Sequence, residues 1–456
     1  MDNLENKLVK YVSSITLDDF SDQIITESKI RLIDTFAVAL YAFNELPVQN
    51  VRKMSLLSSS NNYSSTLWGT SEKVFPDRAS FANGCAVRYL DYNDTYLSKE
   101  ALHPSDSIPA ILAIAEAENL SGSKVIEGLI VSYEIACRLA DASSIRDRGW
   151  DHVAYIAISS ALGASKSLDL SEDEIRNALS IAVVSNNNLR QTRKGELSMW
   201  KGFAAANASR NGVWAALLAK NGITGPYNIF EGEKGFINQI SGPLNISELG
   251  GINNVSFKIS ETSIKCYPVE YHAMSAVKAT LDVKNQIQNI DDIDSITLET
   301  FKVSYQIIGG EKEKWVPKTR ETADHSLPYI ISAVLVDGVI GPEQFSQNKF
   351  TDSKITNLIK KINVNENQTY TDRYPGEILN GIIVHLNDGT IIKSECAVPP
   401  GHFKQPYSLK DISLKFKNST SHILSDHQIE SILNRLTSFD TESDISGFLS
   451  LLDVSG

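Results

Sequence analysis

The sequence predicts a mainly α protein with an α+β second domain, in which both chain ends form a large all-helical domain. Helical periodicity runs from the start of the chain to about residue 240. Strand-like segments follow only between about residues 255 and 393, and helical periodicity returns after Pro399-Pro400-Gly401. A chain of 456 residues also exceeds the size at which one core keeps growing, so two domains are expected.

The helical part is predicted from segments rich in Ala, Leu and Ile, several with small residues on many faces, as suits a closely packed bundle. These segments are Ile108–Ala117, Lys124–Leu139, His152–Ser167, Glu172–Val184 and Gly202–Lys220, with Asp426–Leu436 the clearest in the tail. Ser171 with Glu174 reads as a capping box at a helix start. Lys220-Asn221-Gly222 reads as a helix end.

The middle of the chain mixes strand-like and helical segments. The predicted strands are Val255–Ile259, Ser295–Thr300, Gly381–His385 and Ile391–Lys393, the last two joined by a turn containing Asp-Gly. The interleaved helices are Ala273–Val283 and Pro328–Val336. We therefore expect residues 1–264 and 398–456 to form the helical domain and residues 265–397 the smaller α+β domain.

Composition narrows the class of partner. The formal net charge of −12 disfavours nucleic acid and anionic membrane surfaces, which are bound through basic surface. No run approaches the roughly 20 apolar residues that a membrane span needs. The first thirty residues show no apolar core of a secretory signal. The expectation is a cytoplasmic protein that binds neither nucleic acid nor membrane.

Cofactor motifs are missing from the sequence. The four cysteines are far apart and form no CxxC pair, which gives no indication of an iron–sulfur cluster. There is no GxGxxG, P-loop, GxSxG or HExxH sequence. Asp91 and Asp94 alone are too few ligands for a metal site. We therefore expect neither a cofactor nor a metal.

A short polar segment between two predicted helices carries the first candidate groups. Asp91, Asp94 and Thr95 are followed eight residues later by His103, which begins His103-Pro104-Ser105-Asp106. A carboxylate beside an imidazole fixes its tautomer and raises its basicity, as proton transfer near neutral pH requires. The alternative is ordinary capping, since Asp, Thr and Ser favour helix caps and turns.

Two further segments add an imidazole and positive charge. His152 stands at a predicted helix start, where the helix dipole favours the neutral, basic imidazole; an exposed polar histidine is the alternative. The segment from Arg190 to Lys201 has four bases in twelve positions, including Arg193, and is the most basic place in the chain. Such charge suits carboxylate binding, whereas a solvated loop is the alternative.

Titratable groups also gather at two element boundaries in the middle of the chain. The first is the segment from Lys265 to His272, and the second is Ala323-Asp324-His325-Ser326-Leu327-Pro328-Tyr329. Neither matches a general catalytic motif. Taken singly, a structural histidine is the favoured interpretation of each.

In order and spacing, these segments together resemble the successive signatures of the MmgE/PrpD family, over roughly residues 5 to 405. The resemblance implies a metal-free enzyme acting on a small polycarboxylate, a lid formed by the smaller domain, and a homodimer. When the site residues of the family are carried over motif by motif, the resemblance places seven residues in the site: Asp91, Thr95, His103, His152, Lys201, Lys265 and His272. Arg190 and Arg193 are expected to help bind the substrate.

Within the family, the eight-residue step from Thr95 to His103 and the sequence HPSD resemble the 2-methylcitrate dehydratase branch. The implied reaction removes water from 2-methylcitrate in propionate catabolism. A cis-aconitate decarboxylase, another polycarboxylate lyase or epimerase, and a non-catalytic polycarboxylate-binding protein are the alternatives. The active-site tyrosine of the decarboxylase branch has no matching position in this sequence.

Each site residue then takes an expected role. Lys201 and Lys265 bind carboxylates and stabilise developing charge, and His103 and His152 act as base and acid in an order left open. Asp91 is expected to orient an imidazole. The groups are expected to line one cleft between the domains, as exposed side chains.

Overall fold

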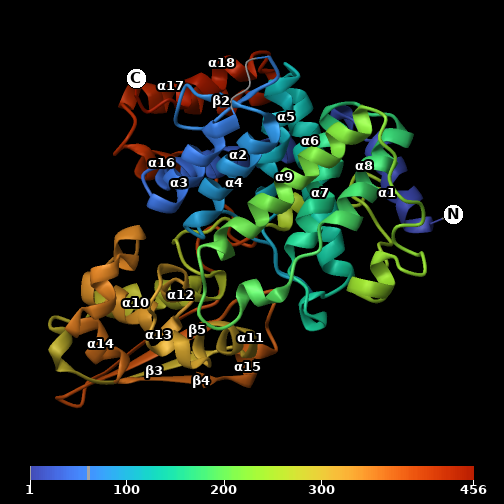
Figure 1. Ribbon diagram of the computed structural model, residues 1–456. Helices are drawn as coiled ribbons and strands as arrows, with labels where there is room; N and C mark the ends of the chain where they lie inside the picture. Colours follow the sequence, from blue (N-terminus) through green and yellow to red (C-terminus); the bar gives the residue numbers. More distant parts are fainter. Residues whose placement is uncertain (1, 59–61, 456) are drawn as a thin grey trace.

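The computed structural model describes residues 2–58 and 62–455, and it confirms a mainly α fold with a small α+β part (Figure 1). Residues from Leu4 to Ile264 and from Ile412 to Leu452 share one hydrophobic core, which defines the larger domain. A second core runs from Val269 to Ile392 and defines the smaller domain. Within the described residues, no helix is both long enough and apolar enough to cross a membrane.

The larger domain is a bundle of helices packed closely around a central group. Its helices from the first part of the chain are α1 (Asn3–Ser14), α2 (Asp22–Tyr41), α3 (Leu46–Ser55), α4 (Pro76–Tyr89), α5 (Ile108–Ala117), α6 (Gly122–Ala142), α7 (Val153–Ser167), α8 (Glu172–Ser185) and α9 (Trp200–Lys220). Helix α7 packs between α6 and α9, and α9 also packs on α4. Glycine residues allow the helices to approach this closely. If Gly163 of α7 carried a Cβ, that atom would lie 2.8 Å from the Gly128 carbonyl oxygen of α6 and would clash with it.

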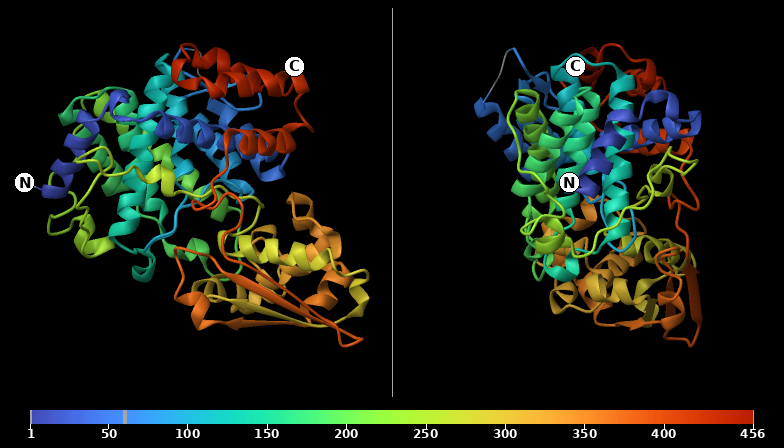
Figure 2. Two further views of the ribbon diagram at one scale, coloured as in Figure 1. Left: turned by 180° about the vertical axis from the view of Figure 1, so that it is seen from behind. Right: turned by 90° about the vertical axis from the view of Figure 1, so that its right-hand side faces the viewer.

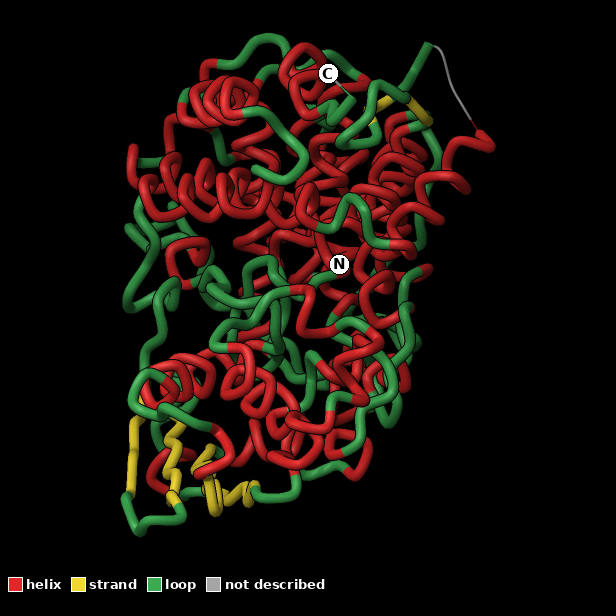
Figure 3. Tube along the Cα trace, turned by 90° about the vertical axis from the view of Figure 1, so that its left-hand side faces the viewer, coloured by secondary structure: helices red, strands yellow, loops and turns green. Residues whose placement is uncertain are grey.

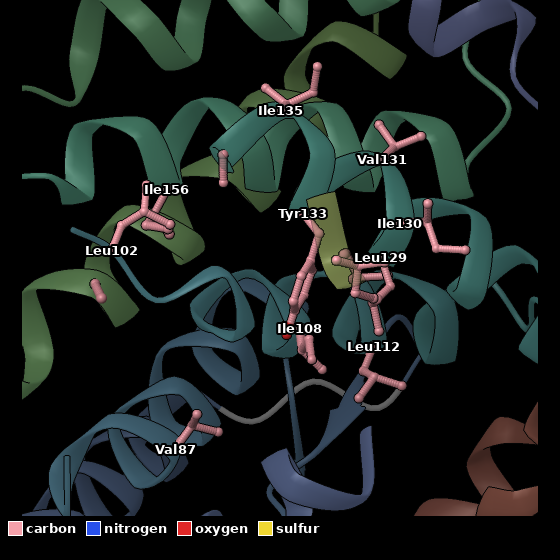
Figure 4. Close-up of a cluster of buried hydrophobic side chains, with 14 of the residues drawn as sticks. Val87, Leu102, Ile108, Leu112, Leu129, Ile130, Val131, Tyr133, Ile135 and Ile156 are labelled. Atoms are coloured by element: carbon pink, nitrogen blue, oxygen red, sulfur yellow. The ribbon is translucent and has the colours of Figure 1, made fainter. Parts of the chain in front are cut away.

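The interior of this bundle is largely apolar, and some buried charged side chains, among them Arg31, Asp34 and Glu134, also lie within it. Figure 4 shows part of it, where Ile108, Leu112 and Leu129 surround Tyr133. The Tyr133 hydroxyl donates to Oδ2 of Asp94 at 2.7 Å, so the core is tied directly to the polar segment that begins at Asp91.

The C-terminal part of the chain returns to the larger domain and packs on its N-terminal half, although the two termini themselves lie far apart (Figures 1 and 2). The C-terminal helices α16 (Leu409–Thr420) and α17 (Asp426–Thr437) pack on α2, and the short α18 (Ile445–Leu449) packs on α5. A short hairpin of β1 (Ser65–Thr66) and β2 (Lys73–Val74) completes this region.

The smaller domain is a four-stranded sheet covered by helices, and its strands gather at one end of the molecule (Figure 3). The strand order is β4-β3-β5-β6; β3 and β4 are parallel and the other pairs antiparallel. The strands are β3 (Ile293–Thr300), β4 (Ile362–Glu366), β5 (Asn380–Leu386) and β6 (Ile391–Cys396). The helices are α10 (Met274–Lys284), α11 (Lys302–Ser304), α12 (Arg320–Ala323), α13 (Leu327–Asp337), α14 (Ser353–Ile359) and α15 (Gln368–Thr371), of which α10 packs on β5 and β6.

Most predicted elements are present with shifts of a few residues. The Ser171 and Glu174 capping box is confirmed, and so is the helix end at Lys220. The strand predicted over Val255–Ile259 is wrong, because the Lys258 N–H donates to the Glu134 carboxylate at 2.7 Å instead of to a neighbouring strand. The prediction also missed β4, a mostly polar edge strand with little hydrophobic alternation.

The two chain crossings between the domains are hydrogen-bonded to each other: the Ile264 N–H donates to the Gly401 carbonyl oxygen at 2.8 Å. Gly401 has a φ of +84°, and a Cβ there would lie 2.2 Å from the Ile264 carbonyl oxygen. Gly401 therefore holds the backbone beside Lys265.

Gly401→Ala is expected to lower the free energy of unfolding by about 1–3 kcal/mol, because it adds a steric clash to a strained backbone. Chemical denaturation measures this. Gly389→Ala is the matched control, since Gly389 has a φ of +88° but no heavy atom of the described residues within 4 Å of an added Cβ. Equal losses in the two variants would show that the contact with Ile264 is unimportant.

Candidate active site

One cavity lies between the two cores, and its wall combines residues of both domains. All nine side chains singled out from the sequence line it: Asp91, Thr95, His103, His152, Arg190, Arg193, Lys201, Lys265 and His272. The structure therefore brings together groups that are separated by up to 181 positions in the chain.

Asp91 is surrounded by cations. It directly follows the end of α4 and takes a left-handed φ of 50°, which turns the chain sharply toward the cavity. Its Oδ1 lies 3.0 Å from Nζ of Lys265, its Oδ2 lies 3.3 Å from Nζ of Lys201, and Arg88 also pairs with it. Burial opposes ionisation, but these three cations outweigh it and hold the pKa of Asp91 well below its ordinary value.

Asp91 does not hydrogen-bond to either of the two histidines expected as base and acid. Nδ1 of His103 is held by the carbonyl oxygen of Asp94 at 2.6 Å, and Nδ1 of His152 by Oδ1 of Asp151 at 3.0 Å. Both partners are acceptors, so the Nδ1 of each neutral ring carries the proton and Nε2 is the basic nitrogen.

His103 and His152 form a pair of imidazoles, with ring centroids 5.9 Å apart. Burial and the charges of Arg88 and Lys265 lower the pKa of His103 well below 6.5. Burial likewise lowers the pKa of His152, although Asp151 opposes this. Both rings are therefore neutral at pH 7 in the free protein and can accept a proton.

The capping interpretation fits Asp94, which lies in the same polar segment. Its carboxylate accepts from the N–H of Ser105 at 3.1 Å and from its hydroxyl at 2.6 Å, at the start of the turn that leads into α5. Thr95 pairs with Ser263 through backbone hydrogen bonds and faces the cavity. Asp94 is thus a structural support for His103, whereas Asp91 belongs to the cavity wall.

The basic segment is folded back to support the cavity. Nε of Arg193 donates to both carboxylate oxygens of Asp151, at 3.1 and 3.0 Å, and its Nη1 donates to the Lys201 carbonyl oxygen at 3.3 Å. The expectation that the site residues are exposed is wrong for Lys201, whose side chain is only 2% exposed in the first turn of α9. It is equally wrong for the other buried site residues: Asp91, Thr95, His152, Lys265 and His272. Nζ of Lys201 lies between Asp91 of the larger domain and Asp324 of the smaller domain, so its burial depends on how the two domains meet.

The smaller domain contributes a third histidine with a fixed partner. Nδ1 of His272 lies 2.7 Å from Oε1 of Glu270, and its Nε2 lies 3.3 Å from the Tyr374 hydroxyl. Despite burial, the neighbouring His272 and His325 lower the pKa of Glu270 to about 2, so Glu270 is ionised.

Sequence reasoning missed several residues of the cavity wall. The charged or hydrogen-bonding ones are Arg88, Glu100, Arg146, Glu270, Tyr271, Lys314 and His325. Arg88 could have been found, because it precedes Asp91 by three positions, a spacing that pairs charges at a helix end. His325 was noted but interpreted as structural.

The cavity carries an excess of positive charge. Seven lining side chains are cationic and three are carboxylates, an excess of four positive charges among the lining groups with the histidines left out of the count. Three of these cations, Arg88, Arg193 and Lys201, also pair with buried carboxylates behind the wall. The chain as a whole has a net charge of −12, so this charge is concentrated locally. A small polyanion fits such a site far better than a neutral or cationic molecule.

Among the described residues, Asp91, Asp324 and His325 are the one group whose ligand atoms lie close enough to hold a metal ion, within 4.8 Å of one another. Nζ of Lys201 and Lys265 already neutralise Asp91, and Lys201 also lies 3.9 Å from Oδ1 of Asp324. A divalent cation would have to displace these ammonium groups.

We therefore predict that turnover is independent of metal. Dialysis against excess chelator is expected to leave the rate of the purified protein within about twofold of its starting value, measured in chelator-treated buffer. Loss of activity that iron or zinc restores would contradict this.

Comparison with known proteins agrees with the geometry. The family model described as the MmgE/PrpD N-terminal domain matches residues 6–248, and the MmgE/PrpD C-terminal domain matches residues 267–438. The chain is 30% identical to the 2-methylcitrate dehydratase of Escherichia coli K12, over 74% of this chain and 73% of that protein. It is 29% identical to the mitochondrial 2-methylcitrate dehydratase of Yarrowia lipolytica, over 84% of this chain and 77% of that protein.

A relative with another activity is also similar. The chain is 26% identical to human cis-aconitate decarboxylase, over 97% of this chain and 92% of that protein. Both family domains and several enzymes thus match across most of the chain. The chain is an enzyme, and it belongs to the MmgE/PrpD family.

Proposed function

We propose that this enzyme is a 2-methylcitrate dehydratase, a hydro-lyase that eliminates water to give 2-methyl-cis-aconitate. The observation that carries the proposal is the cationic cavity, in which two neutral imidazoles face a polyanion site built on Lys201 and Lys265. The similarity to several 2-methylcitrate dehydratases supports the same reaction.

The reaction removes a proton from the carbon α to one carboxylate and expels the β-hydroxyl group. The intermediate state adds negative charge beside an existing carboxylate, so nearby cations must stabilise it. Lys201 and Lys265 supply that charge, and Arg190 and Arg193 help to draw in the remaining carboxylates. One imidazole accepts the carbon-bound proton, and a protonated group gives a proton to the leaving hydroxyl.

Cis-aconitate decarboxylase activity is the second candidate, because the human enzyme is similar over almost the whole chain. Dehydration is favoured by the larger number of dehydratases among the similar enzymes and by the eight-residue step from Thr95 to His103.

The two candidate activities can be distinguished by the products that they form. Purified enzyme is incubated with 2-methylcitrate, citrate or cis-aconitate, and near-ultraviolet absorbance and released carbon dioxide are recorded. The proposal predicts a conjugated product from 2-methylcitrate with no carbon dioxide. Carbon dioxide from cis-aconitate without dehydration of 2-methylcitrate would assign the chain to decarboxylation, and no reaction with any acid would favour a binding protein.

The pH dependence of kcat/KM is expected to show an alkaline limb near pH 8. Burial lowers the pKa of Lys201 to about 8, against the attraction of Asp324 and Asp91, so Lys201 loses its proton and its charge as pH rises through this value. Substrate binding then weakens, whereas the low pKa of His103 and His152 keeps them basic down to below pH 6.5. Lys201→Arg should move this limb upward, and an unmoved limb would contradict the assignment.

We also propose that the enzyme is a homodimer, as the family resemblance implies. The exposed apolar side chains Val184, Leu189, Met199, Trp200 and Trp214 on and between α8 and α9 support an interface there. Light scattering coupled to size-exclusion chromatography should give a mass of two chains, and a single-chain mass would contradict this.

A further inference from the structure

The smaller domain places a carboxylate and imidazole pair on the cavity, Asp324 and His325. Oδ1 of Asp324 accepts from Nδ1 of His325, and its Oδ2 lies 3.4 Å from Nη1 of Arg320. The Asp324 side chain is completely buried, whereas His325 lines the cavity. Because both atoms of the carboxylate are engaged, Asp324 holds the imidazole in one orientation.

The second nitrogen of the His325 imidazole approaches Asp91 in the cavity wall. With the proton on Nδ1, Nε2 of neutral His325 is basic, and it lies 3.7 Å from Oδ2 of Asp91, too far for a hydrogen bond. Nζ of Lys201 lies 3.3 Å from the same Asp91 oxygen and 3.9 Å from Oδ1 of Asp324. His325 therefore reaches the same cation cluster that is proposed to bind the substrate carboxylates.

The other two imidazoles cannot easily perform both proton transfers. His103 and His152 come from the larger domain, and their ring centroids are 5.9 Å apart. Protonating one ring makes protonation of its neighbour less favourable, since two like charges would lie close together in a buried site. The pair is thus suited to carrying one proton. In the stepwise elimination proposed above, the base is protonated before the acid has given up its proton, so both rings of the pair would have to be charged at the same time.

We propose that His325, positioned by Asp324, transfers one of these two protons and that the His103 and His152 pair transfers the other. The proposal rests on the dehydratase function proposed above. The acid imidazole, neutral in the free enzyme, takes up a proton from solvent as the substrate binds. The other imidazole then removes the carbon-bound proton and leaves the electron pair in the negatively charged intermediate. That electron pair forms the double bond as the carbon–oxygen bond breaks and the acid imidazole gives its proton to the departing hydroxyl. Water leaves, and the two imidazoles return to their starting states by exchanging protons with solvent.

The carboxylate partners explain how a buried histidine can hold the transferred proton. Burial and then Lys201 lower the pKa of His325 to about 4 in the free enzyme, while Asp324 and Asp91 oppose this. A bound tricarboxylate adds negative charge next to Lys201, which favours the imidazolium during the reaction. Asp324 is a positioning residue in this scheme and does not contact the reacting atoms.

The test measures dehydration of 2-methylcitrate by wild-type, His325→Asn, His325→Gln, His325→Ala and Asp324→Asn enzymes from pH 5 to 9. Loss of a general acid or base is expected to lower kcat by about 10²–10⁴-fold with little change in KM. Asp324→Asn should lower kcat and also shift the pH profile, because the amide no longer stabilises the imidazolium. Added imidazole should restore part of the activity of His325→Ala.

His427→Asn is the control, since His427 is exposed on α17 in the larger domain, away from the cavity. Thermal unfolding of each variant separates loss of chemistry from loss of folding. Folded His325→Asn and His325→Gln with kcat within a few-fold of the wild type would overturn the inference while leaving the dehydratase function intact. A wild-type enzyme that turns over none of the polycarboxylates would instead overturn the proposed function, and this inference with it.

Discussion

His103→Ala is expected to lower kcat for 2-methylcitrate by about 10²–10⁴-fold, because it removes one imidazole of the proposed proton-transferring pair. The Nδ1 contact with the Asp94 carbonyl is lost, which should cost only about 1 kcal/mol of unfolding free energy. Steady-state kinetics and chemical denaturation measure the two effects separately. The substitution should therefore affect kcat far more than the free energy of unfolding.

His427→Ala is the matched control for this substitution, because the side chain is exposed and distant from the cavity. It should change neither kcat nor stability measurably. A folded His103→Ala enzyme with near-normal turnover would remove His103 from the proposed mechanism.

Lys201→Met should lower kcat/KM by about 10²–10³-fold, the usual effect of removing one group that stabilises developing negative charge. Unlike His103, this residue should also affect folding, because its ammonium group is buried between Asp91 and Asp324. Removing one partner of a buried charge cluster costs about 3–5 kcal/mol, and Arg88 and Lys265 remain to limit the loss. Kinetics at a temperature well below the melting point of the variant keep the two effects apart.

Lys194→Met provides the comparison within the same basic segment. The Lys194 side chain is 59% exposed and pairs with Glu311 on the surface at 3.3 Å, so its loss should leave turnover unchanged. If the two variants lose activity equally, general electrostatic attraction would explain the effect and Lys201 would have no special role.

The helical bundle could be predicted from the sequence because its signals are local. Helix α5 was predicted with the correct bounds from a continuous apolar run, and Ser171 with Glu174 fixed the start of α8. Strand β4 could not be predicted, because its signal is not local. It is an edge strand held by pairing with β3, and such a strand needs little apolar pattern of its own. Its existence depends on tertiary contacts that no short window of sequence contains.

The side chains that line the cavity could be named from the sequence as a set of chemical groups, but their pairings could not. Asp91 and Asp94 look equivalent in the sequence. In the structure, Asp91 forms ion pairs with Lys201 and Lys265. Asp94 instead accepts hydrogen bonds from Ser105 and Tyr133. The burial of Lys201 and the approach of His325 likewise depend on how the two domains meet. These pairings cannot be predicted from the sequence alone, because the partners are far apart in the chain.

The most direct test of the proposed active site is a crystal structure of the His103→Ala variant soaked with 2-methylcitrate. The expected result is a bound tricarboxylate in the cavity, with its carboxylates on Lys201, Lys265 and neighbouring arginines, and with the reacting carbons within reach of His152 and His325. A ligand bound elsewhere, in an enzyme whose wild-type form dehydrates 2-methylcitrate, would show that this cavity is not the catalytic centre.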